Sequence, residues 1–265
     1  MIDAHSIPLP PPPRFEELQT SGPSTRRAGR RWRSGMAQID GVVYPSAYAE
    51  LALSREVTIA ADVPRLICPN FLDDNWTGGR RADPTRASRD LISVGRLARE
   101  KYQVFGLHLI AALRDRGRPT TLTIVGSGDQ LPLLEEHAER LGVTQLVDFA
   151  GPTTEIVDLL IQHRAYLHTS VTETFGITLV EAMAVGLPVL AAPEDAVAEL
   201  FSDTVEGRYL DLTSLERSTE VIAEVLDDLA ALESMGRAGR LRFETQYSSD
   251  VTVARLSDFL GALLR

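Results

Sequence analysis

From residue 89 onward, the pattern of apolar and polar positions predicts strands and helices in regular alternation. Short apolar runs bounded by turn residues predict buried strands, and longer runs with an apolar residue every three or four positions predict helices. The expected strands span 90–95, 121–125, 145–150, 165–169 and 188–192. The expected helices span 103–116, 131–141, 155–162, 215–232, 232–247 and 251–264. This order predicts an α/β fold with a parallel sheet covered by helices on both faces.

The first 88 residues follow a different pattern. A proline run at 8–13 predicts an extended loop, and an arginine-rich stretch at 26–33 predicts part of a helix that continues to Asp40. A short buried strand is expected at 41–45, ending at Ser46, and 76–89 has the composition of a linker. We therefore expect an amino-terminal part at 1–88, a main domain at 89–247 and a terminal helix at 248–265.

Three loops at the ends of expected strands contain glycine or polar residues. Gly95-Arg96 follows one strand, Gly126-Ser127-Gly128 follows the next, and 170–175 follows a third. In parallel sheets, ligands bind at the edge where the strands have their carboxyl ends. These loops therefore predict one shared binding site.

The stretch from Thr169 to Ala191, TSVTETFGITLVEAMAVGLPVLA, has the most specific pattern. We expect a helix to begin at about Phe175, with Glu173 in the loop before it and Glu181 about two turns along it. A glycine at the helix start, Gly176, lets a ligand approach the backbone, and the first free N–H groups favour an anion. A sugar carried on a nucleoside diphosphate fits this arrangement.

Composition and charge argue against several classes of protein. The net charge of −10 argues against a general nucleic-acid binder. The single cysteine, Cys68, excludes an internal disulfide and suits a reducing compartment. No apolar run is long enough to span a bilayer and no signal peptide opens the chain, so we expect a cytoplasmic protein. Among the 27 Lys and Arg residues, Lys101 is the only lysine, and a compact ammonium is a good phosphate ligand.

Four motifs resemble retaining glycosyltransferases of family 4, which have the GT-B fold with two Rossmann-like domains. The stretch from Glu173 to Glu181 resembles their E-x7-E signature. Upstream, Ser93–Leu97 with Lys101 resembles S-V-G-R-L-x-x-x-K, and Ile124–Gly128 resembles I-V-G-x-G. The run I-C-P-N at 67–70, with Asp73, resembles I-P-N-G-V-D. The motifs occur in the family's order between residues 40 and 186.

The resemblance implies transfer of a sugar from a nucleoside-diphosphate sugar, with retention of configuration, to a glycan, lipid or small-molecule acceptor. It implies no metal ion and no other cofactor. The expected catalytic residues are Arg96 and Lys101 at the diphosphate, Glu173 at the sugar, and His5 across the cleft. Glu181 is expected to bind the ribose, in a donor pocket that also includes Gly95, Gly126, Gly128, Phe175, Gly176, Ile177 and Thr178.

The amino-terminal part resembles only the last third of the acceptor domain of that family. We therefore expect an incomplete amino-terminal domain and keep a second hypothesis, a non-catalytic nucleotide-sugar-binding remnant or one subunit of a split enzyme with a partner chain. The arginines at 26–33 leave two interpretations open, a peripheral contact with the inner face of a membrane and a solvated helix face.

The sequence departs from the family pattern at two places beside the site. Tyr102 replaces the glycine that usually follows Lys101, so we expect a backbone that closes less well on phosphate. Pro193-Glu194-Asp195 replaces a Gly-Gly turn before Glu199. A nicotinamide site at Gly126-x-Gly128 is disfavoured, because Leu131 occupies the position of the third glycine.

Overall fold

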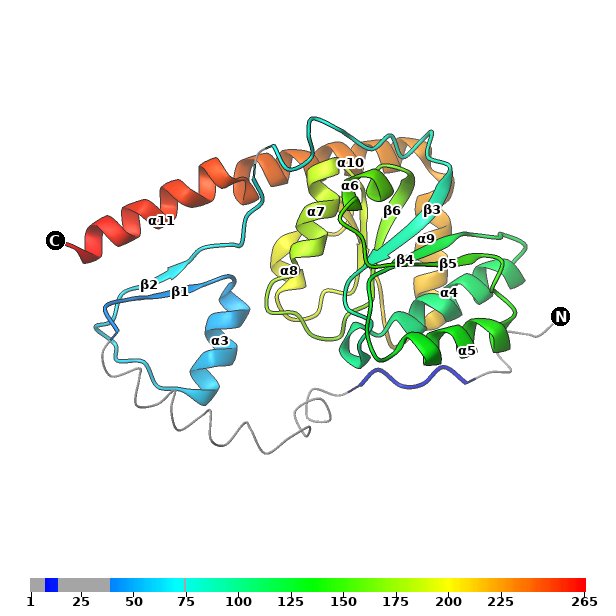
Figure 1. Cartoon of the computed structure of the whole chain (residues 1–265), viewed down its shortest axis with the longest axis horizontal. Helices are drawn as coiled ribbons and strands as arrows, with labels where there is room; N and C mark the ends of the chain where they lie inside the picture. Colours follow the sequence, from blue (N-terminus) through cyan, green and yellow to red (C-terminus); the bar gives the residue numbers. More distant parts are fainter. Residues whose placement is uncertain (1–7, 14–38, 74) are drawn as a thin grey trace.

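A six-stranded parallel sheet forms the centre of the molecule (Figure 1). The structure is a computed structural model that describes residues 8–13, 39–73 and 75–265. The strand order is β5-β4-β3-β6-β7-β8 and every neighbouring pair is parallel. The strands are β3 Arg89–Val94, β4 Leu122–Val125, β5 Val147–Gly151, β6 His163–His168, β7 Val189–Ala191 and β8 Gly207–Tyr209. This confirms the predicted parallel α/β fold.

Helices cover both faces of this sheet and create two cores. Leu91 and Ile92 are neighbours on β3, and both are fully buried, but they belong to opposite cores because successive strand side chains point to opposite faces. The first core includes α4 Gln103–Asp115, α5 Leu131–Leu141 and α9 Leu215–Asp227. The second includes α6 Ile156–Leu160, α7 Ile177–Val185, α8 Val197–Leu200 and η4 Phe243–Tyr247.

Most predicted elements are present, with shifted ends where local signals conflict. Asp228 ends α9 early, because its side chain accepts a hydrogen bond from Ala231 N–H at 2.9 Å and caps α10 Leu229–Arg242. The expected helix over 232–247 therefore starts earlier, and its last turn is the π-helical η4. β8 and the short 3-10 helix η3 Arg99–Lys101 were not predicted from the sequence.

A small amino-terminal lobe, which we define as β1 Val42–Tyr44, α3 Ala47–Glu56 and β2 Arg65–Ile67, lies beside this body (Figure 1). β1 and β2 pair in parallel, and α3 has no buried residue. Helix α11 Ser249–Leu263 extends along the lobe, where Gly41 packs against Phe259 and Leu263. The expected strand at 41–45 is thus β1, whereas the expected arginine-rich helix and His5 lie outside the described residues.

Candidate donor-binding site

The two glycine loops after β3 and β4 are in direct backbone contact. A Cβ atom on Gly126 would lie 1.9 Å from the Gly95 carbonyl oxygen, and one on Gly128 would lie 2.0 Å from that of Leu97. Leu97 N–H also donates to Ser127 O at 2.9 Å. The glycines therefore allow the β3 and β4 loops to pack as one unit at the carboxyl edge of the sheet, as their positions in the sequence predicted.

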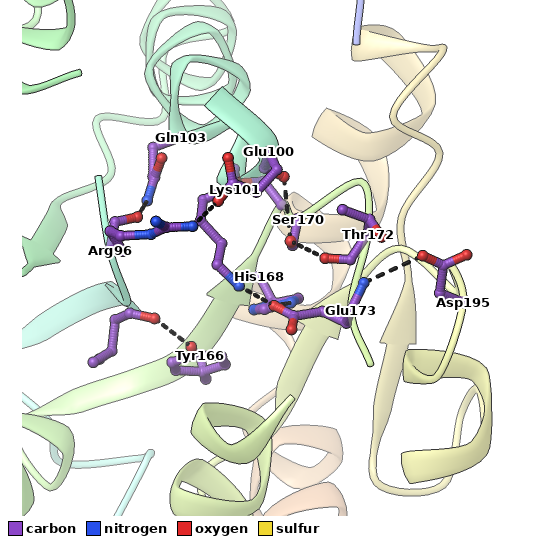
Figure 2. A network of polar contacts seen from close by, with 12 residues as sticks. Arg96, Glu100, Lys101, Gln103, Tyr166, His168, Ser170, Thr172, Glu173 and Asp195 are labelled. Atoms are coloured by element: carbon purple, nitrogen blue, oxygen red, sulfur yellow. Dashed lines mark hydrogen bonds and ion pairs between the residues drawn. The ribbon is translucent and has the colours of Figure 1, made fainter. Parts of the chain in front are cut away.

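Lys101 and Glu173 form an ion pair at this edge (Figure 2). His168, the last residue of β6, places Nε2 3.2 Å from Glu173 Oε1 on the same carboxylate. Burial alone would raise the pKa of Glu173, but the contact with His168 and the charge of Lys101 hold that pKa at about 2. Glu173 is therefore a firmly ionised carboxylate at neutral pH, and its own charge holds the Lys101 ammonium in the site.

Arg96 lies in the same network but is much more exposed than Lys101. Its guanidinium pairs with Glu100, and its side chain is 70% exposed, whereas that of Lys101 is 24% exposed. Its carbonyl oxygen accepts a hydrogen bond from Gln103 Nε2 at 2.9 Å (Figure 2). The structure therefore brings both predicted cations to one edge of the sheet, with Lys101 built into the site and Arg96 at its rim.

Helix α7 begins at Ile177, shortly after Glu173 in the chain, and the backbone N–H groups at its start are open. Gly176 precedes the helix with φ of +96°, a conformation that glycine adopts without strain. The N–H groups of Gly176, Ile177 and Thr178 have no hydrogen-bond acceptor in the described part of the chain. The Phe175 ring is buried against Tyr247, so it anchors the loop and leaves only its backbone for a ligand.

Glu181, on the second turn of α7, is half-buried. Its carboxyl group has no hydrogen-bond or ion-pair partner among the residues that the structure describes. Burial raises the pKa of Glu181 to about 7. Glu173 and Glu181 thus lie in opposite environments, one charged and paired, the other unpaired and easily neutralised. An unpaired carboxylate in a partly buried position is suited to accept hydrogen bonds from hydroxyl groups.

Tyr102 lies in a region of backbone conformation that glycine adopts without strain. Its φ and ψ are 50° and 35°, in the left-handed region. Its ring is buried, stacks on Phe105 with centroids 5.6 Å apart, and its hydroxyl donates to the carbonyl of Pro10. Side-chain packing therefore holds Tyr102 in a strained conformation that costs of order 1 kcal/mol, and the expectation that the backbone here closes less well on phosphate stays a prediction.

Sequence reasoning overlooked His168 and Asp195. His168 lies at the carboxyl end of a parallel strand, and that place was a usable signal. Asp195 Oδ2 accepts a hydrogen bond from Glu173 N–H at 3.3 Å (Figure 2). It has φ of +54°, in the left-handed region that non-glycine residues adopt only at a cost.

The described residues contain neither a metal-binding cluster nor a membrane-spanning helix. No group of three or more His, Cys, Asp or Glu side chains there is arranged to hold a metal ion. No helix in the described ranges has the length and apolar character needed to cross a bilayer.

Sequence comparison finds that residues 82–242 match the family of glycosyl transferases group 1. A GDP-mannose-dependent alpha-(1-6)-phosphatidylinositol monomannoside mannosyltransferase of Mycobacterium tuberculosis is 30% identical over 181 residues, which cover 64% of this chain and 46% of the relative. A glycogen synthase of the same species is 29% identical over 182 residues, 68% of this chain and 44% of the relative. The chain thus spans about half the length of the curated relatives it matches.

Solved structures share the fold at low sequence identity. Sucrose-phosphate synthase from Thermosynechococcus elongatus superimposes with a TM-score of 0.78 at 17% identity, covering 94% of this chain and 65% of that one. Anabaena HepE, solved in complex with UDP and glucose, gives 0.76 at 20% identity, covering 91% and 68%. These similarities support the GT-B fold.

Proposed function

The chain belongs to the glycosyl transferases group 1 family, and from this premise we propose that it transfers a sugar from a nucleoside-diphosphate sugar to an acceptor with retention of configuration. The observation that carries the proposal is the Lys101–Glu173 pair beside the open N–H groups of α7. It combines a cation, free backbone donors and a carboxylate at the ligand-binding edge of a parallel sheet.

In this proposal the diphosphate lies between the Lys101 ammonium and the start of α7. As the bond from the anomeric carbon to the phosphate oxygen breaks, negative charge grows on the departing diphosphate. Lys101 and the N–H groups of Ile177 and Thr178 stabilise that charge without having to reorganise. Arg96, at the rim, adds positive potential at longer range.

The two glutamates bind different parts of the donor. Glu181, unpaired and half-buried, accepts hydrogen bonds from the ribose hydroxyls. Glu173, held ionised by Lys101 and His168, accepts hydrogen bonds from the sugar hydroxyls. An acid and nucleophile pair of a hydrolase would instead flank a single scissile bond. The acceptor attacks on the face from which the diphosphate leaves, and no metal ion takes part.

We propose that the acceptor is a glycan, a lipid or a small molecule. The phosphatidylinositol monomannoside mannosyltransferase is a relative whose name states a lipid acceptor. A lipid acceptor would bring the protein into peripheral contact with a membrane. A partner chain that contributes acceptor contacts belongs to the same proposal. Incubation with UDP-glucose or GDP-mannose, with and without the product of a neighbouring gene, measures turnover directly. Binding without turnover in every combination would favour a nucleotide-sugar-binding module.

Substitution of Lys101 tests the diphosphate site by binding alone. We expect Lys101→Ala to weaken UDP and GDP binding about 10- to 100-fold, since a charge-assisted hydrogen bond contributes roughly 1.5–3 kcal/mol. Isothermal titration calorimetry measures this loss. Arg116→Ala is the matched control, because Arg116 is a cation at the opposite end of α4, paired with Glu220. Equal affinities for Lys101→Ala and the unaltered chain would refute the proposed site.

A further inference from the structure

The first turn of α3 is held by groups from the main body. Glu199 accepts hydrogen bonds from Ala47 N–H at 2.9 Å and from Tyr48 N–H at 2.7 Å, one on each carboxylate oxygen. Ser46, the residue before the helix, accepts from Ala49 N–H at 2.9 Å and donates its hydroxyl proton to Thr174 O at 2.7 Å. We call these contacts of Ser46, Ala47 and Tyr48 with the body the α3 latch.

The latch satisfies the whole amino terminus of α3. The first N–H groups of a helix have no partner within the helix, and a carboxylate there also interacts favourably with the helix dipole. Glu199 takes the first two groups, the Ser46 hydroxyl takes the third, and Glu50 N–H reaches Ser46 O at 3.3 Å. Because α3 has no buried residue, these end-on polar contacts dominate its attachment to the body.

The latch contacts the loop that carries Glu173. Thr174, whose carbonyl takes the Ser46 hydroxyl, is the next residue after Glu173. On the other side, Asp195 Oδ2 accepts from Glu173 N–H at 3.3 Å, and Ala196 N–H donates to Glu173 O at 3.2 Å. The Glu173 backbone is therefore bracketed by the α8 loop and by α3.

Tyr48 adds a contact from the side of α3. Burial, and after it the hydrogen bond and charge of Asp195, raise the pKa of the Tyr48 phenol. Asp195, whose Oδ2 receives Glu173 N–H, is thus near enough to the Tyr48 phenol to raise its pKa.

We propose that the α3 latch, with Asp195, is a positioning device for Glu173, so that the placement of the amino-terminal lobe and the binding of the donor sugar are coupled. The residues of the latch do not contact the donor. They set the backbone position from which Glu173 reaches Lys101, His168 and the sugar. The role at the sugar rests on the proposed function, whereas the effect of the latch on the Glu173 loop does not.

Glu199→Gln is the direct test. Glutamine keeps the size of the side chain, but its NH2 group cannot accept a hydrogen bond, so Ala47 or Tyr48 N–H loses its partner. We expect hydrogen exchange in the peptide 171–176 to become about tenfold faster, because this loop loses its restraint. Ser46→Ala should act in the same direction, and Ser46→Thr, which keeps the hydroxyl, should restore slow exchange. Glu194→Gln is the matched control, because that side chain makes no hydrogen bond to α3 among the described residues.

A binding ratio then tests coupling to the sugar. In Glu199→Gln we expect unchanged affinity for UDP and GDP, while affinity for UDP-glucose or GDP-mannose relative to the bare nucleotide falls about fivefold. A merely structural role would weaken all four ligands alike or none. Unchanged exchange in 171–176 for both Glu199→Gln and Ser46→Ala would overturn the proposal. Failure of the unaltered chain to bind any nucleotide would instead refute the proposed function, and the exchange result would still decide on the latch.

Discussion

The six-stranded body and the amino-terminal lobe are stabilised in different ways. In the body, helix α4 has eleven consecutive buried residues, Gln103 to Leu113, and it packs in the core between the sheet, α5 and α9. In the lobe, α3 has none, and its amino terminus is held by Glu199 and Ser46. The body therefore depends on apolar burial, whereas the amino terminus of α3 depends on a few polar contacts that can form or break at small cost.

This difference suits a binding site that lies between a rigid body and a lobe whose position can adjust. The groups proposed to bind the diphosphate, Lys101 and the start of α7, belong to the body. The loop of Glu173, proposed to bind the sugar, also contacts the lobe through Thr174. A protein built this way can hold the constant part of its ligand firmly and adjust the contacts to the variable part.

The largest effect is expected where two backbones touch in the body. An alanine at Gly126 would place Cβ 1.9 Å from the Gly95 carbonyl oxygen, with φ at +137°. We expect Gly126→Ala to lower the free energy of unfolding by about 4 kcal/mol or more, since clash and backbone strain act together. Urea denaturation followed by circular dichroism measures it.

Gly261→Ala in α11 is the matched control for that substitution. Nothing lies within 4 Å of the added Cβ, and alanine is the better helix former, so stability should stay equal or rise by up to about 1 kcal/mol. If the two substitutions had similar effects, the close contact between the β3 and β4 loops would not be a source of stability.

The body was predictable because its signals are local. Pro132 in the first turn and Gly142 directly after the last turn, with φ of +67°, bound α5, and its predicted and observed ends agree. All four residues of β4 are buried, so its apolar run marks a central strand unambiguously. The loops that carry Lys101 and Glu173 were expected to meet for the same reason, since parallel strands end at a common edge.

Helix α3 and the latch were not predicted, because the contacts that hold them join residues far apart in sequence. The Glu199 carboxylate and the N–H group of Ala47 that it caps are 152 residues apart in sequence. The residues of β2 are exposed, half-buried and exposed, so no buried apolar run marks this strand. The surroundings of Glu173 were only half predicted. Lys101 was expected in the same site, whereas the contacts of Glu173 with His168 and Asp195 were not predicted.

Substituting one helical leucine in each region tests how much apolar burial stabilises the body and the lobe. Leu107 on α4 is fully buried, and Leu51 on α3 is 51% exposed. We expect Leu107→Ala to cost about 3 kcal/mol of unfolding free energy, through lost burial and a cavity. Leu51→Ala should cost less than about 0.5 kcal/mol. Thermal and urea unfolding of both variants test this, and a cost for Leu51→Ala close to that for Leu107→Ala would mean that the lobe is held by apolar packing after all.

Two buried histidines in the body make its stability depend on pH in acid. Burial lowers the pKa of His108 to about 4, helped by His137 and Arg140 nearby. Burial also lowers the pKa of His163 to about 4. Unfolded histidine has a pKa of about 6.5, so the unfolded chain binds more protons between these values. Stability should therefore be complete above pH about 6.5 and fall by up to about 3 kcal/mol per histidine as the pH drops towards 4.

Comparing substitutions of the two histidines distinguishes the cost of protonating a buried ring from the stability contributed by its hydrogen bonds. Neither ring nitrogen of His108 has a partner in the described part of the chain, whereas those of His163 lie 2.7 Å from Leu159 O and 2.8 Å from Thr123 Oγ1. His108→Leu and His163→Leu should flatten the acid dependence equally. At pH 7, however, His163→Leu should cost roughly 1–3 kcal/mol by leaving its partners unpaired, and His108→Leu should cost nothing or stabilise. A loss above 1 kcal/mol for His108→Leu at pH 7 would show that a buried water pairs with that ring, and that polar contacts stabilise the body as well as the lobe.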